Sequence, residues 1–219
     1  MQALTHSLTH SLHTQGMATP DIAARLRLAV DWSQCAVMGS YALHQYMQAA
    51  HLHDPKQPWF PNDIDVGCNI ATHDAFKLHV KRVVDALATN PSTPPVVEKL
   101  VLLTDEERSA RGIAAAARGD EERFHRSIIA TATLRVPGIP VPVQLVGLDT
   151  TESRGDLEAH LDVVTDVPAA VSYRYTHYGS RIFHVPERAV QAIQTRRVPT
   201  RTICSSRMAK YAARGFMFY

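Results

Sequence analysis

Apolar and polar positions along the chain alternate between two spacings, one of about 3.6 residues and one of two residues. The first spacing predicts helices over 22–32, 41–50, 74–88, 104–126 with an interruption at Gly119, 152–163, 186–195 and 204–214. The second spacing, together with short apolar runs, predicts strands over 35–38, 63–68, 96–103, 127–136, 141–148, 170–175 and 181–185. Helices and strands therefore alternate along the chain.

Short turns link two pairs of these strands. Pro137-Gly138-Ile139-Pro140 separates 127–136 from 141–148, and Tyr178-Gly179 lies between 170–175 and 181–185, so each pair is expected to form an antiparallel hairpin. The fold class predicted is α/β (α+β), a mixed β-sheet flanked by helices with a basic C-terminal helical segment. We expect three parts: a loosely ordered segment 1–19, a core 20–150, and a C-terminal extension 151–219 with a hairpin and a basic helix.

The N-terminal segment repeats Thr-His-Ser-Leu, which places His6, His10 and His13 on one side if the segment is helical. Such a stripe could bind a metal ion. A polar segment rich in Ser and Thr at a chain terminus is more often loosely ordered, and that is the interpretation we adopt.

Charge changes this picture at the C-terminal end. The 46 residues from Arg174 to Tyr219 hold nine Lys and Arg and a single acid, Glu187, whereas the 173 residues before them hold 14 basic and 20 acidic residues. A basic segment of this kind suits phosphate, a nucleic acid or the acidic part of the same protein.

Composition excludes some classes of protein. Of the 219 residues, 45% are hydrophobic, yet no apolar run reaches the roughly 18 residues of a membrane-spanning helix. The three cysteines, Cys35, Cys68 and Cys204, form no CxxC motif, so neither a disulfide framework nor a cysteine zinc site is indicated. Cys35 and Cys68 fall in apolar strands, where buried, unreactive thiols are expected. We expect an intracellular, cytoplasmic protein with no membrane partner.

Asp63 and Asp65 carry the most informative pattern of the chain. On a strand, residues i and i+2 point to the same face, so the two carboxylates lie side by side. Two ionised carboxylates repel each other unless a cation neutralises them. A hard divalent ion, Mg²⁺ or Mn²⁺, is the expected ligand; alternatively, Asp63 closes a turn and Asp65 lies at an exposed strand end.

Gly39 and Ser40 stand between a short apolar strand and the next helix. Backbone N–H groups at a helix start bind phosphate, and glycine lets the ligand approach closely. Ser40 is also expected to cap this helix. A phosphate-binding turn and a carboxylate pair on the next strand are the parts needed for nucleotidyl transfer, in which metal ions about 4 Å apart assist attack and leaving group.

The pattern Gly39-Ser40, helix, Asp63-Ile64-Asp65 resembles the signature of the nucleotidyltransferase superfamily, which has the polymerase-β-like fold. The resemblance is carried by residues 37–68, and the order of elements is compatible as far as Leu148. It implies that Asp63 and Asp65 bind magnesium and that Gly39 and Ser40 hold a triphosphate.

The sequence departs from that family in two places. The interval between Gly39 and Asp63 is long, which makes 51–62 an inserted loop at the rim of the site. Active members carry a third carboxylate on a later strand, and Gln144 stands where that acid is expected. An amide offers a carbonyl ligand without charge, so Asp149 or Asp166 would have to substitute; otherwise the protein binds nucleotides without turning them over.

The basic end adds a second resemblance. Residues 207–216 read RxxKYxxRGF, and with the other two motifs they are similar to uncharacterised nucleotidyltransferase-like proteins of fungi and large DNA viruses. Arg207, Lys210 and Arg214 are spaced to share one helical face. That face is expected to bind a triphosphate or a nucleic-acid backbone, the alternative being a solvated or ion-paired face.

Other chemistries find less support. His51-Leu52-His53-Asp54 is similar to part of a metallohydrolase box, but no HExxH accompanies it, and no GxSxG, GxxxxGK[ST] or GxGxxG motif occurs. Our main hypothesis is therefore a nucleotidyltransferase-like protein that binds a nucleoside triphosphate with magnesium and transfers a nucleotidyl group to an unknown acceptor. In it Asp63, Asp65, Gln144 and Asp166 are candidate catalytic residues, and Lys210 steadies the pyrophosphate.

Two alternatives belong to other classes. One is a catalytically degenerate nucleotidyltransferase fold that serves as a binding or scaffold module. The other is a nucleic-acid-binding protein that uses the basic C-terminal segment.

Overall fold

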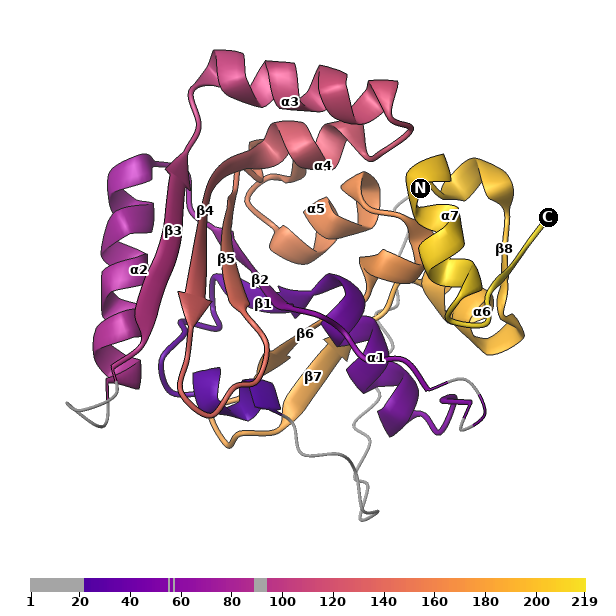
Figure 1. Ribbon diagram of the computed structural model, residues 1–219, viewed down its shortest axis with the longest axis horizontal. Coiled ribbons are helices and arrows are strands. Elements are labelled where there is room, and N and C mark those ends of the chain that lie inside the picture. The colour runs from indigo at the N-terminus through magenta and orange to yellow at the C-terminus, as the bar shows by residue number, and fades with distance from the viewer. Residues whose placement is uncertain (1–21, 55, 57, 89–93) are drawn as a thin grey trace, which may run out of the picture.

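The computed structural model describes residues 22–54, 56, 58–88 and 94–219 (Figure 1). The predicted N-terminal segment 1–19, with its histidine stripe, lies outside the described residues. Among the described residues, no helix is long and apolar enough to cross a membrane.

One sheet organises the described part of the chain. It has seven strands in the order β3-β4-β5-β2-β1-β6-β7, and β2 and β5 are parallel while all other neighbours are antiparallel. The strands are β1 Cys35–Met38, β2 Ile64–Asn69, β3 Val96–Leu102, β4 Ile128–Arg135, β5 Val143–Leu148, β6 Ser172–Tyr175 and β7 Arg181–His184. A two-stranded parallel pair, β8 Arg197–Val198 and β9 Met217–Phe218, stands apart.

Helices connect these strands. They are α1 Gly39–Ala49, α2 His73–Leu87, α3 Asp105–Ala117, α4 Glu122–Ser127, α5 Leu157–Val164, α6 Glu187–Thr195 and α7 Ser205–Ala212. Short 3-10 helices occupy Ile22–Leu26, Thr151–Ser153, Val167–Ala170 and Thr200–Thr202. A mixed sheet with helices confirms the predicted fold class.

Each face of the sheet is covered by different helices. On one face, Val37 and Val66 pack in the main core with Phe76 of α2. On the other face, Met38 and Val146 pack in a smaller core with residues of α5. In Figure 1, α2 flanks the β3 edge, whereas α6 and α7 stand beside α1 near the other end of the molecule.

Local sequence explains where several helices begin and end. Thr72 caps α2 by accepting a hydrogen bond from the Ala75 amide, and Thr104 and Glu107 form a capping box at the start of α3. Gly119, with φ +67°, follows α3. The left-handed backbone conformation of Gly119 separates α3 from α4, which confirms the interruption predicted there.

Two helix predictions need correction. Only Ile22–Leu26 of the predicted helix 22–32 is helical, as a 3-10 helix, because Leu26 and Val30 reach the core through turns. The predicted helix 152–163 is broken at Arg154 and Gly155, both at positive φ. Asp156 then caps α5 with two hydrogen bonds from backbone amides.

The C-terminal segment takes part in the main sheet. Strand β6 pairs with β1, and β7 pairs with β6, so both predicted hairpins are present. Two strands of the segment 151–219 therefore extend the main sheet.

Candidate functional site

Most of the residues singled out by sequence surround one cavity of about 280 Å³. The cavity lies on the α5 side of the sheet, between the β1–α1 junction, the starts of β2 and β5, and helix α7. Its lining includes Gly39, Ser40, Asp63, Asp65, Gln144, Arg207 and Lys210. These positions are up to 171 residues apart in sequence, and the fold brings them to one place.

The two carboxylates enter the cavity at the start of β2. Asp63 precedes the strand, and Asp65 is paired with Met38 on β1 and with Gln144 on β5. Burial and the neighbouring Asp63 carboxylate raise the pKa of Asp65 to about 7, although Lys210 and Arg207 oppose the shift. A cation between the two acids would remove this repulsion.

Gly39 forms the turn beside the carboxylates. Its φ of +67° is in the left-handed region, and a Cβ placed on it would lie 3.4 Å from Oδ2 of Asp65. Helix α1 begins here, and its N-cap residue, Met38, makes no side-chain capping hydrogen bond. Its first N–H groups therefore remain available to an anion bound next to the acid pair.

Ser40 is held by the C-terminal part of the chain. Its hydroxyl accepts a 3.1 Å hydrogen bond from Nη1 of Arg214, so the expectation that Ser40 caps α1 is wrong. The Arg214 guanidinium also lies 4.2 Å above the Trp59 ring. Arg214 is buried and is absent from the cavity lining, so it positions Ser40 and Trp59.

Arg207 lines the cavity, but carboxylates engage its guanidinium. Nη2 lies 2.8 Å from Oε2 of Glu121, and Nε lies 3.1 Å from Oδ1 of Asp120 and 3.9 Å from Oδ2 of Asp166. Burial opposes ionisation of Arg207, yet Glu121 and its neighbours raise its pKa. Burial raises the pKa of Glu121 to about 7, against the effect of Arg207.

Lys210 is the cation that stays available. Its side chain is exposed at the cavity, and within the described part of the chain it forms no ion pair. Burial and the nearby Arg214 and Arg207 lower the pKa of Lys210, while Asp63 and Asp65 act in the other direction. Of the three side chains on the predicted basic face, Arg207 and Arg214 therefore contact other residues of the protein, and Lys210 lines the cavity.

Neither Asp149 nor Asp166, the two acids expected to substitute for Gln144, lines the cavity. Asp149 lies beyond the opposite end of β5 and pairs with Arg108 at 2.9 Å. Asp166 is buried outside the cavity lining, where Oδ1 accepts a hydrogen bond from the Cys204 amide. The position of Asp166 therefore does not support the catalytic role expected for it, and it anchors the start of α7.

Sequence reasoning missed several residues of the cavity. Glu121 and His125 come from α4 and its N-terminal end, and Thr131 comes from β4 on the same sheet face as Gln144. Nothing in the polar stretch 104–126 distinguishes these side chains from solvated ones. Only the packing of α4 over the sheet reveals them.

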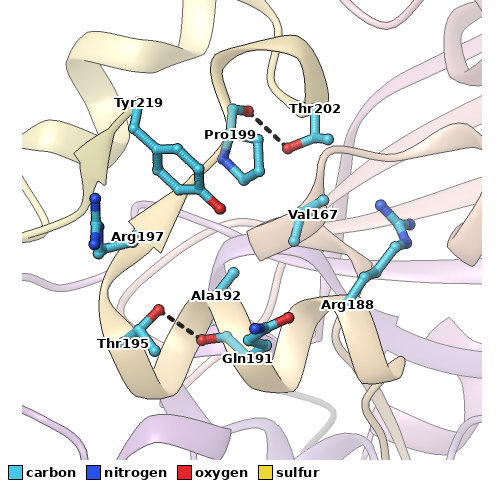
Figure 2. Close-up of a pocket in the computed structure, with 9 residues that line it drawn as sticks. All are labelled: Val167, Arg188, Gln191, Ala192, Thr195, Arg197, Pro199, Thr202 and Tyr219. Atoms are coloured by element: carbon cyan, nitrogen blue, oxygen red, sulfur yellow. Dashed lines mark hydrogen bonds between the residues drawn. The ribbon is translucent and has the colours of Figure 1, made fainter.

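A second cavity, of about 370 Å³, lies between α6 and β8 (Figure 2). Figure 2 shows Tyr219 and Pro199 facing Ala192 and Gln191 across it. Its lining has no carboxylate and none of the residues predicted from sequence. Although it is larger, it lacks the chemistry of the first cavity.

Among the comparisons with known proteins, only the one with solved structures gives likenesses, and the one described here is distant. No family model matches the sequence, and no curated protein matches it. Among solved structures, the chain is similar to a CCA-adding enzyme in complex with CTP, with a TM-score of 0.47 and 12% sequence identity. The match covers 83% of this chain and 34% of that chain, so the protein spans about a third of the length of that enzyme.

Proposed function

We propose that the cavity between β2, α1 and α7 binds a nucleoside triphosphate with magnesium and that the protein transfers a nucleotidyl group to an acceptor. The observation that carries this proposal is the convergence of Asp63 and Asp65 with the uncapped start of α1 in one cavity. Carboxylates and phosphate-binding amides side by side fit a metal-bound phosphate chain.

The donor atoms suit a hard divalent cation. Asp63 and Asp65 would hold Mg²⁺ or Mn²⁺ through carboxylate oxygens, and Gln144 beside Asp65 offers a carbonyl oxygen. A bound ion would neutralise the acid pair and polarise the phosphate that reacts.

The remaining groups bind and orient the nucleotide. The first amides of α1 would donate hydrogen bonds to phosphate oxygens, which Gly39 allows to approach closely. In the reaction, the acceptor oxygen forms a bond to the α-phosphorus and loses its proton, while the bond between the α- and β-phosphates breaks and pyrophosphate leaves. Lys210 would balance the charge on the pyrophosphate.

Calorimetry with each nucleoside triphosphate, with and without Mg²⁺, tests the proposal. We expect magnesium-dependent binding to the wild type and at least a tenfold loss of affinity in the double variant Asp63→Asn, Asp65→Asn. The control is Asp74→Asn, Asp85→Asn, which removes two carboxylates from exposed positions of α2 and should bind as the wild type. Equal binding by both double variants would reject the proposed site.

A binding module without turnover is the second candidate, because Gln144 stands beside Asp65 where a third acid is expected. Gln144→Glu adds a carboxylate of nearly the same shape. If a missing acid limits the protein, the variant should bind Mg²⁺ on the order of tenfold more tightly, since carboxylate charge sets affinity for hard cations. Pyrophosphate release measured for both proteins separates the candidates: release by the wild type excludes the module.

A further inference from the structure

A second group of metal-binding side chains lies on the other face of the sheet. Cys35 of β1 and Cys68 of β2 are directly opposite each other in the antiparallel pair, and His79 projects from α2. Cys68 lies three residues after Asp65, so its side chain points to the face away from the nucleotide cavity. The cluster is therefore separate from the acid pair.

The distances within this cluster match those of a tetrahedral zinc site. Nε2 of His79 lies 3.8 Å from Sγ of Cys35 and 3.6 Å from Sγ of Cys68, and the three donor atoms lie within 4.8 Å of one another. Bond lengths of about 2.3 Å to sulfur and about 2.0 Å to nitrogen at tetrahedral angles place S and N about 3.6 Å apart. A single ion fits among the three donors with little movement.

The electrostatics of the pair favour one thiolate. The Cys68 thiol and His79 lower the pKa of Cys35 to about 6 despite burial, whereas Cys35 and burial raise the pKa of Cys68 well above its ordinary value. Metal binding requires both thiolates, so the ion would release the remaining thiol protons to solvent.

The surroundings allow an ion to reach the site. Both cysteines are buried, but His79 is half-buried on α2. Asp31, which is exposed, interacts electrostatically with His79 and Cys35. With three protein donors, a water molecule would complete four-fold coordination.

We propose that Cys35, Cys68 and His79 form a site for a thiophilic divalent metal ion, of which Zn²⁺ is the representative, and that the ion ties β1 and β2 to α2. The expectation of unreactive thiols in two separate strands did not anticipate this cluster, because Cys35 and Cys68 are 33 residues apart and form no spaced motif. Only the register of β1 and β2 brings them together.

Cobalt substitution of the full chain, kept reduced and stripped of metal, tests this site. We expect one equivalent of Co²⁺ to give a thiolate-to-cobalt charge-transfer band. Cys204→Ser is the matched control, because this third cysteine lies apart at the start of α7, and it should keep the band. Cys35→Ser and Cys68→Ser should lose most of it. Asp63→Asn, Asp65→Asn should keep it, which separates this site from the nucleotide cavity.

A second variant guards against misfolding of the buried cysteine variants. His79 is half-buried on a helix, so His79→Gln is expected to fold, and its Zn²⁺ affinity should fall at least tenfold. Zn²⁺ should raise the melting temperature of the wild type, and at the same Zn²⁺ concentration it should raise that of His79→Gln by less. Absence of the thiolate band in the wild type, unchanged Zn²⁺ affinity in His79→Gln, or a Cys35–Cys68 disulfide that persists by mass spectrometry in protein purified with a reductant would each overturn the proposal.

Discussion

Gly39 occupies the point at which β1 turns into α1 next to the carboxylate pair. Its backbone has φ +67°, and the space where a side chain would begin is 3.4 Å from Asp65. Glycine meets both demands at once, because it adopts the left-handed conformation without strain and leaves room for a ligand.

Replacing Gly39 tests two effects separately, the cost of backbone strain to stability and the loss of nucleotide affinity. Gly39→Ala should destabilise the protein by about 1 kcal/mol, the order of cost for a side chain at positive φ, and weaken nucleotide binding. Gly155→Ala is the control, because Gly155 has φ +81°, an added Cβ would make only an ordinary contact with Nδ2 of Asn69 at 3.8 Å, and the position is away from the cavity. Urea denaturation and calorimetry measure the two effects. Wild-type affinity in Gly39→Ala would contradict the role assigned to the turn.

At the level of elements, helix α7 is fixed to α4 by one guanidinium among three acids. Arg207 contacts Asp120 and Glu121 directly, and Asp166 at a longer distance. Glu121 and Asp166 are 7% and 4% exposed, so the ion pairs are largely removed from water. They hold α7 in the orientation that directs Lys210 to the cavity.

Arg207→Met should therefore be strongly destabilising. It leaves buried carboxylates without their cation, for which a cost of about 3 kcal/mol is expected. The folded-state pKa of Glu121 is already raised to about 7 by burial, so the folded protein prefers this acid protonated. The free energy of unfolding then decreases as pH rises from about 4.5 through the folded-state pKa. The loss of stability in Arg207→Met, relative to the wild type, should therefore be larger at about pH 8 than at about pH 5.

Chemical denaturation at the two pH values measures this deficit. The double variant Arg207→Met, Glu121→Gln should recover part of the stability, because it removes one of the stranded charges. A deficit that does not depend on pH, with no recovery in the double variant, would show that Arg207 acts through packing alone.

Helix α1 carries a second titratable contact, between His44 and the rings of His53 and Trp59. His44 is 1% exposed, and its ring centroid lies 5.0 Å from that of Trp59 and 5.1 Å from that of His53. Burial, His53 and Arg214 lower the pKa of His44 to about 4. Protonation of His44 is therefore disfavoured in the folded protein.

The sign of the linkage follows from the lowered pKa. Between pH 6.5 and about 4 the unfolded chain binds a proton that the folded His44 does not, so stability is full above pH 6.5 and decreases below it. At pH 5 this amounts to about 2 kcal/mol, from 1.4 kcal/mol per pKa unit. His44→Phe keeps a ring in place and should remove that part of the pH dependence. Parallel stability profiles for wild type and variant would contradict the assignment.

At the scale of the whole molecule, the sheet separates two kinds of chemistry. Asp65 and Gln144 face the cavity with hard oxygen donors, whereas Cys35 and Cys68 face α2 with sulfur donors. The C-terminal segment joins both the sheet, through β6, and the cavity, through α7. Residues from nearly the whole described chain are therefore needed to complete the site.

Sequence predicted those parts of the fold that local patterns encode. The strand Cys35–Met38, the hairpins and the helix interruption near Gly119 follow from spacing and turn residues, and the strand geometry of Asp63 and Asp65 places both at one cavity. The role of Glu121 was not predictable, because its partner Arg207 is 86 residues away. The same holds for Asp166, whose burial depends on how α7 packs.

The most direct test of the central claim is a crystal structure of the full chain with Mn²⁺ and a non-hydrolysable nucleoside triphosphate analogue. Anomalous scattering locates manganese independently of the nucleotide. The account predicts a manganese peak within coordination distance of both Asp63 and Asp65, with the phosphates at the start of α1. Nucleotide bound in the cavity between α6 and β8, or manganese away from the two acids, would contradict it.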